Sequence, residues 1–164
     1  MLNKRHNNRK FQRASYEMND ARAKKSLSDY LISNGYDTHL KPDDYKFDLK
    51  ATKNNKEELF EVEVKLQWGE TWNPEWVEIR IPERKQRLID LWKKDFPHLK
   101  FTFVILNTTV SQGWFIPADV VDESRVGTIQ NSRQIGKPHL KEPFFHIPME
   151  KATLKTLSND KESS

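Results

Sequence analysis

The chain has 164 residues, with 28 lysines and arginines against 24 aspartates and glutamates and a formal net charge of +4. This length suits one domain with its own core, and the modest positive charge favours an anionic partner such as nucleic acid. The absence of cysteine excludes disulfides and thiolate zinc sites, and no apolar run is long enough to span a membrane. We therefore expect a cytoplasmic protein without membrane association, and we do not expect the basic, polar N-terminus to be a secretory signal.

The first residues of the chain are basic. We predict that residues 1–13 form a flexible arm, which either contacts phosphate or remains a solvated terminus. The basic residues of this arm, which are candidates for nucleic-acid contact, are Lys4, Arg5, Arg9, Lys10 and Arg13. We assign residues 14–157 to a single domain and residues 158–164 to a disordered tail.

Residues 14–34 have the spacing of a helix. Ser15 is a candidate N-cap, and Gly35 is a candidate C-terminal stop. The apolar side chains form one stripe at 3.6 residues per turn, and Asp20 falls inside that stripe. We expect the segment 36–40 that follows to begin a sheet.

The stretch 45–68 predicts two strands joined by a turn. In residues 45–50 and again in residues 60–66, apolar and polar side chains alternate, which is the period of a strand with one polar face. The polar linker between them contains Asn54 and Asn55, which favour tight turns, so we predict an antiparallel hairpin.

Charged groups gather on the polar face of this hairpin. Glu63 and Lys65 share that face, because side chains two residues apart on a strand point the same way. A fold about the two asparagines puts Asp48 opposite Glu61, and a slightly longer loop puts it opposite Glu63. In either register Asp48, Glu63 and Lys65 converge as two carboxylates and an ammonium.

Such a trio has a chemical use. Two carboxylates can hold Mg²⁺, a hard cation that prefers oxygen ligands. The bound metal polarises a phosphoryl oxygen and helps to make a water nucleophilic, and a lysine beside it orients that water or offsets charge on the phosphate. An ordinary ion pair across a strand face is the structural alternative.

The middle of the chain continues with regular elements. Tryptophans in the loop 67–76 either stack on bases or close over the edge of the sheet. We then predict a strand at 76–82, a helix at 82–96, a buried strand at 101–106 and a further strand at 113–121. A strand, a helix and a buried strand in this order predict a right-handed parallel crossover.

The last third of the chain has weaker patterns. The basic segment 124–141, which includes Arg133 and Lys137, is either a loop that orders on nucleic acid or a plain surface loop. We predict an edge strand at 144–147 and a short amphipathic helix at 148–157. The whole order of elements predicts an α/β fold, a three-layer sandwich around a mixed central sheet.

Asp48 and the triplet Glu63-Val64-Lys65 resemble the signature of the PD-(D/E)XK nucleases, in which an aspartate precedes a Glu-x-Lys strand across a hairpin. The resemblance covers residues 14–121 and implies a restriction-endonuclease-like core that hydrolyses nucleic-acid phosphodiesters with a metal ion. It implies that Asp48 and Glu63 ligate Mg²⁺, or Mn²⁺ in its place, together with the backbone carbonyl of Val64. Lys65 would then serve the attacking water.

Other positions relate to this family less directly. Many of its members take a further acid from the first helix, but the leucine and glycine spacing of this helix puts Lys24 where the archaeal Holliday-junction resolvases have that acid. Glu17 and Asp20 are the substitutes, although charges near a helix start also have a structural explanation. Gln86 is a further candidate, because several relatives use a glutamine of the corresponding helix. The literal Pro42-Asp43 pair is an alternative source of the first acid.

We therefore expect a small Mg²⁺-dependent endonuclease that acts on DNA, similar to Holliday-junction resolvases or to phage and repair-type nucleases. A homodimer is expected, because such cores often pair so that two sites address two strands. The alternatives are a non-catalytic nucleic-acid-binding or assembly protein that keeps the fold, and an RNA endonuclease of the same fold. A structural protein with a charged strand face is the alternative from another class.

Overall fold

The structure, a computed structural model, describes residues 2–39, 46–128 and 142–157, and it describes residues 2–16 by their backbone alone. Several predictions fall outside the described residues. These are the alternative acid at Pro42-Asp43, the greater part of the basic segment with Arg133 and Lys137, and the tail 158–164.

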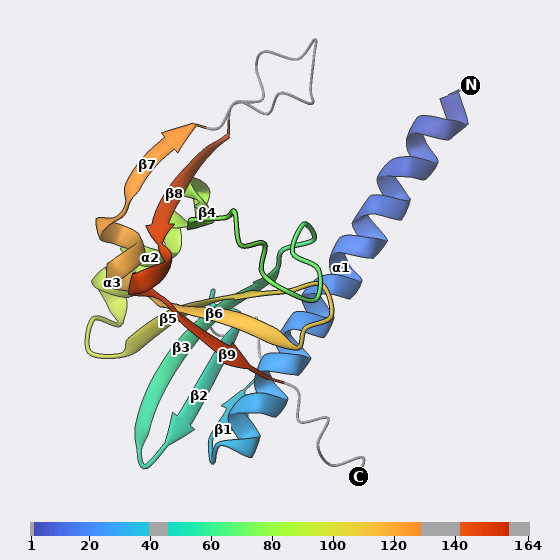
Figure 1. Cartoon of the computed structure of the whole chain (residues 1–164). Coiled ribbons are helices and arrows are strands. Elements are labelled where there is room, and N and C mark those ends of the chain that lie inside the picture. Colours follow the sequence, from blue (N-terminus) through green and yellow to red (C-terminus); the bar gives the residue numbers. More distant parts are fainter. Residues whose placement is uncertain (1, 40–45, 129–141, 158–164) are drawn as a thin grey trace.

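The described residues form an α/β fold (Figure 1). Its helices are α1 (Leu2–Ser33), α2 (Gln86–Asp95) and α3 (Ala118–Glu123), with short 3₁₀ turns η1 (Glu83–Lys85) and η2 (Met149–Lys151). Its first strands are β1 (Asp37–His39), β2 (Leu49–Lys53), β3 (Lys56–Val64), β4 (Glu78–Pro82) and β5 (Lys100–Leu106). The later strands are β6 (Gln112–Pro117), β7 (Arg125–Thr128), β8 (Pro143–Pro148) and β9 (Thr153–Thr156).

Six strands form the main sheet, in the order β1-β2-β3-β5-β6-β9. The pair β3 and β5 is parallel and the other neighbours are antiparallel, so the sheet is mixed, as predicted. The predicted parallel crossover from the strand at 76–82 to the strand at 101–106 is wrong, because β4 lies in the other sheet and the parallel neighbour of β5 is β3. The remaining strands form a small antiparallel sheet in the order β4-β8-β7.

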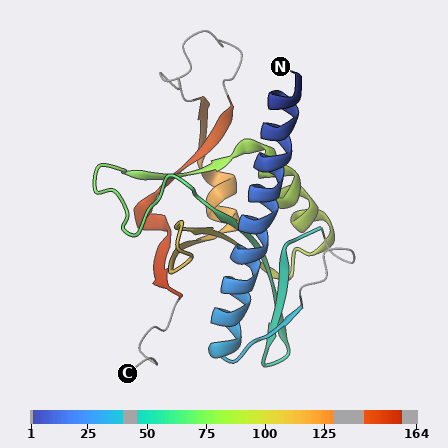
Figure 2. The same ribbon diagram turned by 90° about the vertical axis from the view of Figure 1, so that its right-hand side faces the viewer.

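The main sheet lies between two layers. Ala23, Leu27 and Leu31 of α1 are buried against one face of the sheet, together with Phe60 and Val62 of β3. The other face packs against α2, α3 and the small sheet through a larger apolar core. Figure 2 shows α1 in front of the main sheet, with α2 and α3 behind it.

The hairpin of β2 and β3 turns at Asn54 and Asn55, both of which have positive φ angles of 53° and 63°. A two-residue turn with both residues left-handed matches the twist of the strands it joins, and asparagine tolerates this conformation. The turn pairs Lys53 with Lys56 and Leu49 with Phe60. The register is therefore the one that a fold about the two asparagines predicts.

The boundaries near this hairpin differ from the prediction. β2 begins at Leu49, whereas we expected a strand from residue 45. Phe47 packs in the core on the α2 side, while Leu49 packs under α1, so the expected alternation does not extend back through Phe47. The first helix also begins earlier than predicted. We expected a helix from residue 14, but α1 begins at Leu2 and includes most of the segment 1–13, for which we expected a flexible arm.

Three predictions for the second half of the chain are wrong. The expected strand 113–121 ends at Pro117, and Ala118–Glu123 form α3 instead. The expected edge strand 144–147 is β8, the middle strand of the small sheet. The expected helix 148–157 is the turn η2 followed by β9, which pairs with β6.

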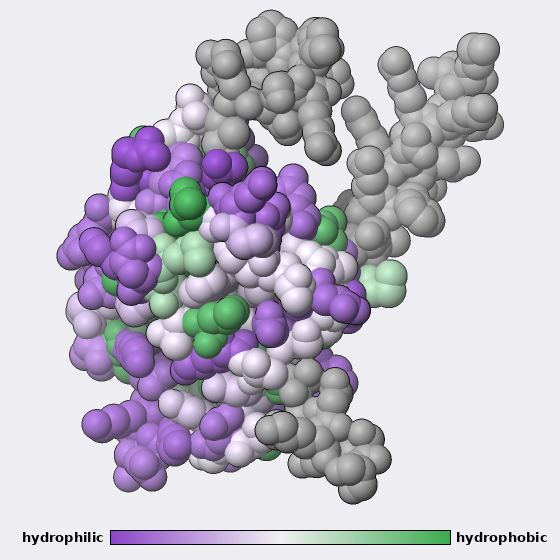
Figure 3. Space-filling view, viewed as in Figure 1, coloured by the Kyte–Doolittle hydropathy of each residue, from purple (hydrophilic) through white to green (hydrophobic). Residues whose placement is uncertain are grey.

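The surface of the face drawn in Figure 3 is mostly hydrophilic, and its hydrophobic residues form small, separate patches outside the atoms drawn in grey. Within the described residues, none of the helices combines the length and the apolar character that a membrane crossing requires.

Candidate active site

Asp48 and Glu61 meet at the open end of the hairpin. The ladder of β2 and β3 pairs Leu49 with Phe60, and one further step places Asp48 opposite Glu61. The backbone N–H of Val62 donates a hydrogen bond of 2.9 Å to Asp48 Oδ2, which fixes the aspartate beside β3. Asp48 is half-buried, and only 6% of the Glu61 surface is exposed. The register therefore gives Asp48 the neighbour Glu61 rather than Glu63.

Glu63 follows Glu61 along the same face of β3, as the alternation predicts, and Lys65 directly follows the strand, where its N–H donates to the Leu106 carbonyl. This face carries Leu59 into the larger core, so it is covered rather than fully solvated. Glu63 and Lys65 are both half-buried. The polar face of the hairpin is thus an interior surface that passes from the Asp48–Glu61 pair to Lys65.

Burial and like charge together disfavour ionised glutamates on this face. Burial, a hydrogen bond with Asp48 and the Asp48 charge raise the pKa of Glu61 to about 9, although Lys85 opposes the shift. Burial also raises the pKa of Glu63, against the opposing charges of Lys85, Arg84 and Lys65. At neutral pH a protonated Glu61 donates a hydrogen bond to the Asp48 carboxylate.

Lys85 is the residue of this region that sequence reasoning missed. It lies in η1, and its Nζ is 3.7 Å from Glu61 Oε2, with both side chains largely buried. We expected Gln86 to reach the site from the same helix, but its Nε2 donates to Asp90 and Asp122. The sequence predicts that a helix follows the strand at 76–82. Only the packing of η1 near β3 shows that Lys85 is the residue that reaches Glu61.

The first helix contributes a cation rather than an acid. Lys24 Nζ lies 3.6 Å from Asp48 Oδ1 and 3.0 Å from Asp20 Oδ2. Burial opposes its charge, but the contacts with Asp20 and Asp48 outweigh burial and raise the pKa of Lys24. Asp20 therefore reaches the site through Lys24, and Glu17 is exposed on the preceding turn of α1.

The donor set fits a hard divalent cation. Asp48 and Glu61 supply carboxylate oxygens side by side, and the buried Glu61 has Lys85 at 3.7 Å as its cationic neighbour. Among the described residues, no three His, Cys, Asp or Glu side chains are close enough together to form a metal cage. Mg²⁺ does not need one, because it usually keeps several waters and binds one or two carboxylates plus substrate phosphate.

The tryptophans of the loop 67–76 pack inward. Trp68 is fully buried, and Trp72 makes edge-to-face contacts with Trp68, Trp76 and Trp114 at centroid distances of 5.0–5.4 Å. Trp76 remains partly exposed, and Lys65 Nζ lies 5.6 Å from the centre of its ring. Closure over the sheet is thus the main role of the loop, and Trp68 is excluded from contact with a ligand by its burial.

Five further basic candidates for nucleic-acid contact come from the start of the chain. Lys4, Arg5, Arg9, Lys10 and Arg13 lie on the first turns of α1, which extend beyond the main sheet (Figure 1). A hollow of about 280 Å³ lies on the α1 face of the sheet. Three lysines, Lys53, Lys100 and Lys155, are part of its lining. It is on the opposite face from the Asp48–Glu61 pair, so its size does not make it the centre of the chemistry.

Comparison with known proteins finds no matching family profile, curated protein or solved structure for this chain. The resemblance to the PD-(D/E)XK nucleases therefore rests on the residues and on the order of the elements.

Proposed function

We propose that this protein is a metal-dependent endonuclease that hydrolyses phosphodiester bonds of DNA on a restriction-endonuclease-like core. The observation that carries the proposal is the carboxylate pair of the half-buried Asp48 and the buried Glu61 at the open end of a β-hairpin, with Glu63 next on the same face. The hairpin, α2 and the parallel strand β5 follow in the order that the resemblance implies. A net charge of +4 suits a polyanionic substrate.

In this proposal the residues of the chain have distinct roles. Asp48 and Glu61 would hold Mg²⁺, which would supply polarisation of a phosphoryl oxygen and activation of water. Glu63 accepts a proton from the attacking water, and Lys85 offsets the charge that develops on the phosphate. The water oxygen would bond to phosphorus, the bond from phosphorus to the leaving oxygen would break, and the leaving oxygen would take up a proton from solvent.

This assignment differs from the one that the signature implies. The signature makes Glu63 the second metal ligand, with the Val64 carbonyl, and gives the water to Lys65. The register instead makes Glu61 the neighbour of Asp48, and Lys85 is the lysine beside Glu61. Substitution separates the two sets, because the set of the signature requires Lys65 for turnover and the set proposed here requires Lys85.

The test is cleavage of a labelled panel that contains duplex, single strand, flap, four-way junction and hairpin RNA, in Mg²⁺, Mn²⁺ or EDTA. We expect Asp48→Asn, Glu61→Gln and Lys85→Ala each to reduce metal-dependent cleavage of DNA by about a hundredfold or more. Lys25→Ala is the matched control, because this exposed lysine pairs only with Asp29 on the surface of α1.

The outcomes of the panel are distinct. Cleavage that requires Lys65 but not Lys85 would restore the set of the signature. Preferential cutting of hairpin RNA would make the protein an RNA endonuclease of the same fold. Cleavage that persists in EDTA or in Asp48→Asn would refute the metal-dependent mechanism. Light scattering of the same preparations tests the homodimer, which we propose because two sites can address two strands.

DNA binding without cleavage is a second candidate, and one observation favours it. Lys24 Nζ lies 3.6 Å from Asp48 Oδ1, so an ammonium of the chain already neutralises part of the charge that a metal would meet. In an active enzyme Lys24→Met should raise the affinity for Mn²⁺ severalfold, because it removes this competing cation. In a non-catalytic protein the wild type binds the panel without cutting it, and Lys24→Met restores no cleavage.

A further inference from the structure

A small hollow lies beside Lys65, where β3 gives way to the tryptophan loop. Its volume is about 140 Å³, and Lys65, Trp72, Trp76 and Arg80 are part of its lining. This volume is close to the roughly 150 Å³ of a cavity that takes one benzene ring, so the hollow suits one aromatic ring and not a stack of bases. The rim also carries Gln67 and Glu75, an amide and a carboxylate that can hydrogen-bond to the edge of such a ring.

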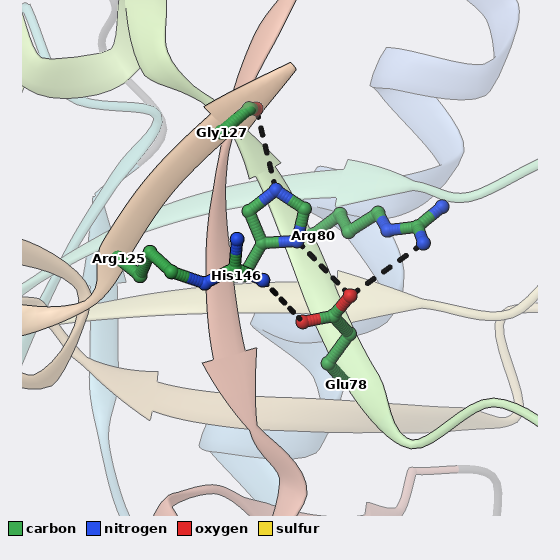
Figure 4. Close-up of polar contacts among 5 residues, drawn as sticks. All are labelled: Glu78, Arg80, Arg125, Gly127 and His146. Atoms are coloured by element: carbon green, nitrogen blue, oxygen red, sulfur yellow. Dashed lines mark hydrogen bonds and ion pairs between the residues drawn. The ribbon is translucent and has the colours of Figure 1, made fainter. Parts of the chain in front are cut away.

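The hollow carries two cations close together. Lys65 Nζ lies over the Trp76 ring at 5.6 Å, and Arg80 extends along β4 into the same lining. The Arg80 guanidinium is 3.5 Å from Glu78 Oε1, but that carboxylate also pairs with His146 at 3.0 Å and with Arg125 at 3.8 Å. Figure 4 shows Glu78 between Arg125 and Arg80, which lie on opposite sides of it.

Because Glu78 also contacts His146 and Arg125, it leaves some of the hydrogen-bond donors of Arg80 unused. A guanidinium has five N–H donors, and a single carboxylate oxygen at 3.5 Å uses little of that capacity. Arg80 is exposed and Lys65 is half-buried, so an anion that reaches the hollow meets both. Planar phosphate recognition by arginine and point-charge recognition by lysine are common in nucleic-acid sites.

The hollow lies a short distance from the candidate active site. Lys65 directly follows β3, four residues after Glu61, and the rise of an extended chain makes that separation about 13 Å. This separation would let one DNA strand place a phosphate at the Asp48–Glu61 pair and another of its nucleotides in the hollow, outside the bond that is cut.

We propose that this hollow is a subsite for one unpaired nucleotide of the substrate, with its base against Trp76 and its phosphate between Lys65 and Arg80. The proposal rests on the nuclease function and deepens it. The enzyme cuts DNA in which a nucleotide near the scissile phosphate is free of its complement, as in a single strand, a flap or a junction. A fully paired duplex cannot place a base there without breaking a pair.

Equilibrium binding in EDTA, where metal-dependent cleavage cannot occur, tests the subsite by itself. The probes are a labelled single strand, a flap and a blunt duplex of the same sequence. The variants are Arg80→Ala, Trp76→Leu and the conservative Trp76→Phe, with Arg87→Ala on α2 as the control for loss of an exposed arginine. Thermal unfolding of each variant shows whether the Trp76 changes leave the fold intact.

We expect Trp76→Leu to weaken binding of the single strand and flap about tenfold or more, and Trp76→Phe to restore most of it, because stacking needs an aromatic face. Arg80→Ala should weaken the same probes and reduce the slope of log affinity against log salt by about 0.7, the value for one lost phosphate contact on a single strand. Duplex binding should change less than twofold in both variants, and Arg87→Ala should resemble the wild type.

The proposal is overturned if the variants leave single-strand binding unchanged, or if they weaken duplex binding by the same factor. Its failure is distinguishable from failure of the nuclease function. If the wild type cleaves DNA but Trp76→Leu and Arg80→Ala bind the single strand and the flap as the wild type does, the subsite alone is rejected. Binding through Trp76 and Arg80 without cleavage in any metal would reject the nuclease and leave the subsite in place.

Discussion

Glu61 is a buried carboxylate whose surroundings disfavour its charge. Burial and Asp48 raise its pKa from 4.5 to about 9, so the folded protein holds a proton that the unfolded chain releases between these pH values. The stability that this proton provides is complete below pH 4.5 and is lost as the pH rises towards 9. Without a bound cation, Glu61 therefore lowers the free energy of unfolding at neutral and alkaline pH. A bound cation would offset this loss.

Glu61→Gln should stabilise the protein while it inactivates it. The neutral amide can still donate a hydrogen bond to Asp48, so we expect a free energy of unfolding about 1–3 kcal/mol higher than the wild type at pH 7.5. Denaturant titrations at several pH values should show the gap widen from pH 5 to pH 9. Glu57→Gln, an exposed carboxylate on the same strand, should change stability by less than about 1 kcal/mol. A wild type that gains stability from pH 5 to pH 9 relative to Glu61→Gln would contradict the burial argument.

At the scale of residues, the sequence was informative where local chemistry decides the outcome. The asparagine turn predicts the register that sets Asp48 opposite Glu61, and the alternation of β3 predicts that Glu63 and Lys65 share a face with Glu61. The choice of Glu63 over Glu61 came from the signature and not from the turn. Lys85 was beyond reach, because a contact between η1 and β3 depends on how the crossover packs.

At the scale of elements, the hairpin turn holds the carboxylates in register. Asn54 and Asn55 both adopt left-handed conformations, which cost a non-glycine residue more than they cost glycine. Asn55→Gly should therefore be neutral or raise the free energy of unfolding by up to about 1 kcal/mol, with full activity. Asn55→Val should lower it by about 1–2 kcal/mol, because a β-branched residue is strained at positive φ. Urea titrations of the pair would measure both, and equal stability of the two variants would contradict the turn assignment.

The small sheet is joined by one polar cluster. His146 of β8 contacts Glu78 of β4 at 3.0 Å through Nδ1 and the Gly127 carbonyl of β7 at 3.2 Å through Nε2, as Figure 4 shows. Burial alone would raise the pKa of Glu78, but the hydrogen bond and charge of His146, with Arg80 and Arg125, outweigh burial and lower it. A lowered folded-state pKa contributes stability above the unfolded value of 4.5, and that contribution is lost as the pH falls through the folded value.

Glu78→Gln should accordingly destabilise the protein by about 1 kcal/mol at pH 7, a modest value because the carboxylate is partly solvated. The difference from the wild type should shrink in acid, as the pH falls through the lowered pKa of Glu78 and the wild-type carboxylate also becomes neutral. Thermal unfolding at pH 7 and at pH 3.5 would measure this. A difference that stays constant over that range would show that packing, and not charge, explains the loss.

The elements that sequence patterns missed are those that tertiary pairing decides. Residues 148–157 have helical spacing, yet β9 forms there because β6 would otherwise present an open edge to solvent. Thr153 and Thr156 were a signal, since β-branched residues favour strands. In α3, Pro117 precedes a first turn that contains Asp119, a helix start that the two following valines obscured. By contrast, the buried run at β5 was correctly predicted because its apolar side chains serve both faces of the sheet.

At the scale of the molecule, the two faces of the main sheet have separate tasks. The α1 face is an apolar core that supports the sheet, and the opposite face combines a core with the polar groups of the candidate site. Lys24 and Lys85 approach the Asp48–Glu61 pair from α1 and from η1, so the pair lies where the two layers meet at the end of the hairpin. A cation bound there would contact groups held by several elements, and its effect should extend to the stability of the whole fold.

Metal binding should therefore stabilise the whole protein, and more so at higher pH. A ligand that binds only the folded state at about 100 times its dissociation constant adds about 2.7 kcal/mol to the free energy of unfolding. Because Glu61 must lose its proton to bind the metal, we expect the affinity for Mn²⁺ to rise by up to about tenfold per pH unit between pH 6 and pH 8. Calorimetry in two buffers of different ionisation enthalpy should show about one proton released for each Mn²⁺ bound at pH 7.

Two variants test which residues bind the metal. Asp48→Asn should abolish the increase in unfolding temperature that Mn²⁺ causes, and Glu61→Gln should abolish the proton release. A pH-independent affinity would mean that Glu61 is not a ligand, and it would return the second metal position to Glu63.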